Sequence, residues 1–162
     1  MKENLCQRVP RSFPKLPLKL TPHHRNHLKP FKVAQQIDAL LSEVISAQKD
    51  YVARLCAVCE DPCCKRVTYL FDERDLIFAK VLARNGAPKK KPRKASLGCP
   101  FLSDSGCVLS PMNRPFTCHR YLCSALEEEM TKQDPSLVPS LKKKFRVLEE
   151  LRGQLWKAYV EA

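Results

Sequence analysis

The segment CAVCEDPCC, residues 56–64, places four of the chain's nine cysteines within nine positions. Four more lie in residues 99–123, within CPFLSDSGCVL and RPFTCHRYLC. A C-x-x-C element suits metal chelation, because a tight turn directs both sulfurs at one ion. Tetrahedral zinc needs four such ligands, and so does an iron–sulfur cubane. The spacing therefore predicts thiolate coordination of zinc, iron or an iron–sulfur cluster by Cys56, Cys59, Cys63, Cys64, Cys99, Cys107, Cys118 and Cys123.

Disulfides and plain buried thiols are the alternatives to a metal. Residues 1–20 are basic, but prolines interrupt them and no apolar run follows, so we expect no secretory signal. No run of eighteen apolar residues predicts a membrane span. A reducing, cytoplasmic location is therefore expected, and it disfavours disulfides. Nine cysteines also cannot all pair, and Cys6, far from both groups, is expected to be a bystander.

The number of metal sites stays open at this point. Eight thiolates suffice for two closed sites, or for one site with additional structural or redox thiols. Neighbouring side chains usually diverge, so Cys63 and Cys64 are expected to serve different sites or a bridged pair of metals, unless one lies in the core. Thiolate sites carry negative charge, and outer-shell partners orient their ligands. We expect Arg114 and Arg120 to be outer-shell partners of this kind, and we expect His119 to have an outer-shell or surface role.

The net charge of +12 is confined to two segments. Residues 1–35 hold eight Lys/Arg against one acid, and KKKPRK (89–94) adds five bases. The bases and acids of the remaining residues balance. A zinc-stabilised adaptor that binds nucleic acid through the basic tail and loop is therefore an alternative function, but not the favoured one.

The elements expected around the cysteines are mainly helical. Residues 1–31 are expected to form a basic, Pro-rich disordered tail, and residues 32–162 are expected to form a cysteine-cluster metal-binding domain. Apolar residues at three- and four-residue steps predict helices over 33–55 and 140–160. Residues 124–134 predict a short acidic helix, 65–71 an extended segment and 99–109 a hairpin. Asp72 is expected to cap a further helix, with Asp75 as its reciprocal partner. The fold class is a small, metal-stabilised α-rich domain with a short β-hairpin and cysteine-rich loops.

These motifs resemble a known family. CAVCEDPCC, CPFL, GCVL and RPFTCHRYLC, within residues 52–125, are similar to the YkgJ-like cysteine-cluster family, described as zinc- or iron-chelating CxxCxxCC proteins. The resemblance implies a mostly helical domain that gathers cysteines around zinc, iron or an iron–sulfur cluster. The chain departs from the family pattern at Glu60-Asp61-Pro62, which makes the second gap three residues instead of two.

The favoured function is that of a metal-binding cysteine-cluster protein. An iron–sulfur redox or protein-modifying enzyme is the first alternative, because similar modules are described in such roles. No Gly-rich nucleotide loop or persuasive catalytic constellation is visible in the sequence. The sequence leaves open whether the protein is an enzyme, which metal it binds, its oligomeric state and any partner protein.

Overall fold

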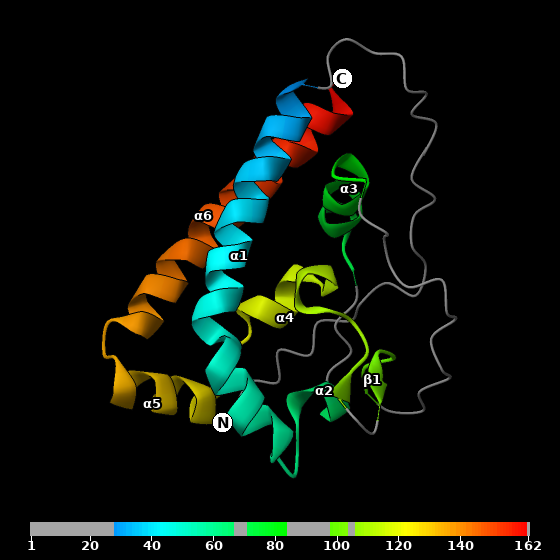
Figure 1. Ribbon diagram of the computed structural model, residues 1–162. Coiled ribbons are helices and arrows are strands. Elements are labelled where there is room, and N and C mark those ends of the chain that lie inside the picture. Colours follow the sequence, from blue (N-terminus) through cyan, green and yellow to red (C-terminus); the bar gives the residue numbers. More distant parts are fainter. Residues whose placement is uncertain (1–27, 67–70, 84–97, 104–105, 162) are drawn as a thin grey trace, which may run out of the picture.

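Two long antiparallel helices form the frame of the protein (Figure 1). The computed structural model describes residues 28–66, 71–83, 98–103 and 106–161. Helix α1 spans Leu28–Ala57 and α6 spans Leu137–Val160, and they pack along one another more extensively than any other pair of described elements. Their buried faces repeat at three- and four-residue steps, as amphipathic helices require: Ala34, Ile37, Leu41, Val44, Leu141, Phe145, Leu148 and Leu155. The predicted mainly helical class is confirmed.

Two shorter helices complete the main core. Helix α3, Glu73–Val81, begins with the predicted capping box, in which Asp75 N donates to the Asp72 side chain and Asp72 N donates to the Asp75 side chain. Helix α5, Ser124–Gln133, packs against both α1 and α6 through buried Leu126 and Met130. Both helices lie where the sequence predicted them.

The remaining elements are small and carry four of the eight cysteines in the described part of the chain. They comprise α2 (Cys63–Arg66), β1 (Leu102–Ser103), β2 (Gly106–Cys107), the 3-10 helix η1 (Pro111–Asn113) and α4 (Phe116–Arg120). The two strands form an antiparallel hairpin that pairs Leu102 with Cys107. The predicted hairpin is therefore confirmed, although its turn residues 104–105 lie outside the described part.

The structure differs from the sequence prediction at two boundaries. Helix α1 includes residues 28–31, which the sequence assigned to the tail, because Pro30 in the first turn removes no helical hydrogen bond. Residues 1–27 lie outside the described residues. The extended segment predicted over 65–71 is wrong for Lys65 and Arg66, which end α2 in a turn where Lys65 N donates to the Pro62 carbonyl at 2.8 Å. Residues 67–70 also lie outside the described part.

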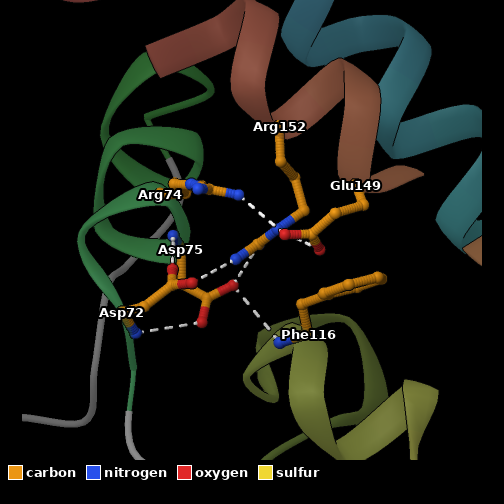
Figure 2. A network of polar contacts seen from close by, with 6 residues as sticks. All are labelled: Asp72, Arg74, Asp75, Phe116, Glu149 and Arg152. Carbon is orange, nitrogen blue, oxygen red and sulfur yellow. Dashed lines mark hydrogen bonds and ion pairs between the residues drawn. The ribbon is translucent and has the colours of Figure 1, made fainter. Parts of the chain in front are cut away.

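A buried ion pair joins three helices (Figure 2). Arg152 of α6 has only 4% of its side chain exposed, and it contacts Asp75 at 2.5 Å and Asp72 at 2.6 Å. The Asp75 carboxylate also accepts a hydrogen bond from the Phe116 N–H, which is one of the unpaired donors at the start of α4. Burial alone would lower the pKa of Arg152, but the two carboxylates outweigh it and raise that pKa. The network thus fixes α4, and with it Cys118, against the helical frame.

Across the described residues, none of the helices combines the length and apolar character that a membrane crossing needs.

Candidate metal centre

The first cysteine group lies at the junction of α1 and α2. Cys56 is in the last turn of α1 and Cys59 follows the helix, and both residues are exposed. Cys63 and Cys64 begin α2 and are half-buried. None of these four residues forms a disulfide bond within the described part of the chain. The long amphipathic helix therefore delivers this group to one end of the frame, as its periodicity predicted.

The β-hairpin is docked directly on the first group. Cys99 N donates a hydrogen bond to the Cys64 carbonyl at 2.7 Å. Gly98, with φ +100, lies so close to this segment that an added Cβ would be 2.9 Å from the Lys65 carbonyl oxygen and 3.0 Å from that of Cys64. Only glycine fits such a close backbone approach at a positive φ. Residues 33 to 35 positions apart are thus held together by backbone geometry.

A small apolar cluster surrounds this contact. Its buried members are Cys99, Phe101 and Leu109, and Cys64 and Cys107 pack against them together with Phe71 and Leu102. The Phe71 and Phe101 rings meet edge to face, with centroids 5.7 Å apart. The hairpin brings Cys107 back to the cluster that contains Cys99, as the sequence predicted.

The last two cysteines come from the segment around α4. Cys118 lies within α4, and Cys123 immediately precedes α5, where its carbonyl accepts from Glu127 N. Cys118 is half-buried, whereas Cys123 packs against the main helical core. Both residues are free cysteines.

The thiols of the two groups influence one another electrostatically. The pKa of Cys64 is raised most by its hydrogen bond with the Cys63 thiol and then by burial. The nearby thiols of Cys63, Cys99 and Cys118 raise it further. Burial raises the pKa of Cys118 to about 12, and the thiols of Cys99 and Cys107 contribute next. Burial and crowding therefore disfavour the simultaneous deprotonation of several adjacent thiols, unless a bound cation neutralises the thiolates.

A similar shift affects the first group. Although Cys56 is exposed as a residue, partial burial of its thiol is the largest cause that raises its pKa, and the thiols of Cys63, Cys123 and Cys59 add to it. Arg114 opposes this shift and also opposes the shift of Cys118. Since one guanidinium acts on thiols of both groups, Arg114 lies within electrostatic reach of each. Its Nε donates to the Leu109 carbonyl at 3.2 Å, which ties the start of the α4 segment to the hairpin.

His119 and Arg120 occupy different environments. Only 5% of His119 is exposed, so the surface alternative for this residue is wrong. Its ring pKa falls to about 4 because of burial and then Arg114, although a hydrogen bond to the Pro111 backbone opposes the change. Within the described part of the chain, its Nε2 has no hydrogen-bond partner. Arg120 is exposed and lines a surface hollow with Glu127 and Lys142.

The donor chemistry fits zinc or iron, but the side chains are not in coordinating positions. Among residues 28–66, 71–83, 98–103 and 106–161, no three or more His, Cys, Asp or Glu side chains are arranged to hold a metal ion. Coordination therefore requires the thiols to move closer together than they lie here. Cys56 and Cys59 are exposed, and neither belongs to the two apolar clusters that the described residues form.

Sequence reasoning missed the residues that position α4. Asp75 was expected only as a capping residue, and no role was predicted for Arg152. The available signal was that Arg152 follows Leu148 by four residues and precedes Leu155 by three, on the apolar stripe of α6. An arginine in such a position needs a buried acidic partner. Gln48 gives the same signal on α1, and its side-chain amide donates to the His119 carbonyl at 3.0 Å.

No family model, curated protein or solved structure matches the chain. The similarity to the YkgJ-like family therefore stays a prediction based on the motifs themselves.

Proposed function

We propose that this chain is a metal-binding cysteine-cluster protein that coordinates zinc, iron or an iron–sulfur cluster through thiolates from both cysteine groups. The observation that carries the proposal is the docking of the hairpin on Cys64, because it brings cysteines from distant segments, Cys64, Cys99 and Cys107, into one small apolar cluster. Free thiols crowded in this way disfavour their own deprotonation, and a bound cation reverses that preference.

The metal also has a structural role in this proposal. The elements that carry the second group are short, and their apolar cluster has only three buried members among the described residues. A core of that size supplies little folding free energy, whereas thiolate coordination of zinc supplies a large amount. A reducing cytoplasm, which keeps thiols available for metal, is the location that suits this role.

Anaerobic purification followed by elemental analysis for zinc and iron tests the proposal. A brown protein with absorption near ~400 nm that dithionite bleaches would identify an iron–sulfur cluster, and a colourless protein with tightly held zinc would identify a structural zinc site. The first outcome would also favour the redox alternative over a purely structural role.

Matched cysteine variants locate the ligands. Cys64→Ser and Cys107→Ser should lower metal content and stability together, since each removes a thiol from the docked cluster. Cys6→Ser, the control, should change neither. A folded, anaerobically prepared protein without zinc or iron would contradict the proposal, and so would full metal content in both cluster variants.

A further inference from the structure

We propose that the surface hollow between α4, α5 and α6 binds a small phosphate monoester with an apolar body, independently of the metal centre. The hollow has a volume of about 360 Å³, which lies within the range of pockets that hold small molecules. A second cavity, lined by Asp75 and Arg152 among others, measures only about 30 Å³ and has room for little more than a water molecule. Size therefore favours the hollow as the place for a ligand.

The hollow has two walls. One wall is a stripe of α6 whose residues recur at three- and four-residue steps and so share one face of the helix: Lys142, Phe145, Arg146 and Glu149. The opposite wall comes from the last residue of α4, the connection to α5 and the first turn of α5: Arg120, Leu122 and Glu127. The packing of α5 against α6 holds the two walls next to one another.

Both carboxylates of the hollow are already paired with a base. Glu127 contacts Lys142 across the hollow at 3.0 Å. Glu149 contacts Arg74 of α3 at 2.7 Å, and Figure 2 shows the two side chains directed toward one another. Within the described part of the chain, by contrast, neither Arg120 nor Arg146 forms an ion pair or a hydrogen bond through its side chain. Two uncompensated guanidinium charges therefore remain at the hollow.

This pair of charges determines the class of ligand. A guanidinium group presents a planar fork of donors that binds phosphate oxygens bidentately. A phosphate monoester carries a charge of about −1.5 to −2 at neutral pH, which matches Arg120 and Arg146 together. A single carboxylate would neutralise only one of the two arginines. The charge balance therefore favours the phosphate monoester over a monocarboxylate.

The hollow also contains an apolar surface for the rest of the ligand. Leu122 is half-buried, and Phe145 has only 6% of its surface exposed. The Phe145 ring meets Phe116 edge to face, with centroids 6.5 Å apart. Phe116 is fixed in turn by the hydrogen bond from its N–H to Asp75 and by the Arg152 guanidinium above its ring. The apolar surface is thus held in place before a ligand binds, which lowers the entropic cost of binding.

NMR titration of the nitrogen-15-labelled full chain with phenyl phosphate tests the proposal on the wild-type protein. We expect saturable shifts at the arginine Nε–H groups of the hollow and at backbone amides of residues 120–127 and 142–149. Inorganic phosphate, which lacks the apolar body, and benzoate, which carries one charge, should both bind more weakly. Shifts that do not saturate, or that spread over the exposed basic residues of the whole chain, would overturn the proposal.

Matched charge variants locate the binding groups. Arg120→Gln and Arg146→Gln should each weaken phenyl phosphate binding about tenfold or more, the loss expected for a charge-assisted hydrogen bond, and the double variant should abolish saturable binding. Both arginines are exposed, so urea unfolding of the variants should match that of the wild type. Lys143→Gln is the control, because it removes an exposed charge from the same helix outside the hollow.

Two results would contradict the assignment of the hollow. An equal loss of affinity in Lys143→Gln and Arg146→Gln would show that net charge attracts the anion, and unchanged affinity in the double variant would place binding elsewhere. Metal content provides the separate readout for the proposed function. It should stay at the wild-type level in both arginine variants, so a chain that binds metal but no phenyl phosphate would overturn this proposal alone.

Discussion

Replacing Asp75 by asparagine tests whether the Asp75–Arg152 pair holds α4 in place. Asparagine keeps the size of the side chain and an oxygen for the Phe116 N–H, but it removes the negative charge and the second oxygen, which accepts from Asp72 N in the capping box. Arg152 is then left with 4% of its side chain exposed and with the carboxylates of Asp72 at 2.6 Å and Glu149 at 4.0 Å. Breaking a buried pair costs about 3–5 kcal/mol. Because Asp72 remains, we expect a loss of about 3 kcal/mol in the free energy of unfolding.

Urea unfolding of the full chain, followed by the helical circular dichroism signal, measures this loss. Glu43→Gln is the matched control, since it makes the same carboxylate-to-amide change in the Lys144–Glu43 pair between α6 and α1. That pair has a similar distance, 2.8 Å, but its side chains are 32% and 58% exposed. An exposed pair contributes about 0–1 kcal/mol, so the control should lose at most that amount.

A double variant separates the ion pair from packing. Asp75→Asn combined with Arg152→Met removes both charges of the pair, and it should recover a large part of the stability that Asp75→Asn loses. If Asp75→Asn is no more destabilising than Glu43→Gln, the argument that buried charge pairing fixes α4 is wrong.

Three further predictions concern the docking, the core and the metal. Gly98→Ala should weaken hairpin docking and reduce metal content, because its Cβ meets backbone at 2.9 Å and φ is +100, whereas Gly153→Ala, in open space within α6, should stabilise by about 0.5–1 kcal/mol. Equal metal content in both glycine variants would contradict this. Leu148→Ala should cost about 2–5 kcal/mol in urea unfolding, because Leu148 is fully buried, and the neighbouring Val147→Ala, 40% exposed, should change stability by less than about 0.5 kcal/mol. Metal removal by a chelator should speed hydrogen exchange at hairpin amides and leave the α1 and α6 amides protected, so uniform loss of protection would argue against a local structural metal.

The helices were predictable because local patterns specify them. The apolar steps of α1 and α6 and the Asp72/Asp75 capping box depend on residues three or four positions apart. The short hairpin was predictable for the same reason, since its turn lies between two close apolar arms. The start of α1 was harder to predict. Pro30 was assigned to the tail, although a proline is tolerated in the first turn of a helix.

The position of α4 was not predictable from these patterns. Asp75 and Arg152 lie 77 positions apart, and no local signal says which buried arginine pairs with which aspartate. The sequence predicted that both cysteine groups converge, but the Gly98 approach to Cys64 and the assignment of Cys123 to the helical frame depend on tertiary packing. The metal itself is the part that neither the pattern nor the packing identifies.

X-ray absorption spectroscopy at the zinc or iron edge of the anaerobically purified chain tests the central claim most directly. Coordination by thiolates predicts a first shell of sulfur, at about 2.3 Å for zinc. The sulfur signal should fall in both Cys64→Ser and Cys107→Ser, because Cys64 belongs to the first cysteine group and Cys107 to the second, and both groups supply ligands. A first shell of nitrogen or oxygen, or a sulfur shell that survives unchanged in both variants, would contradict the account.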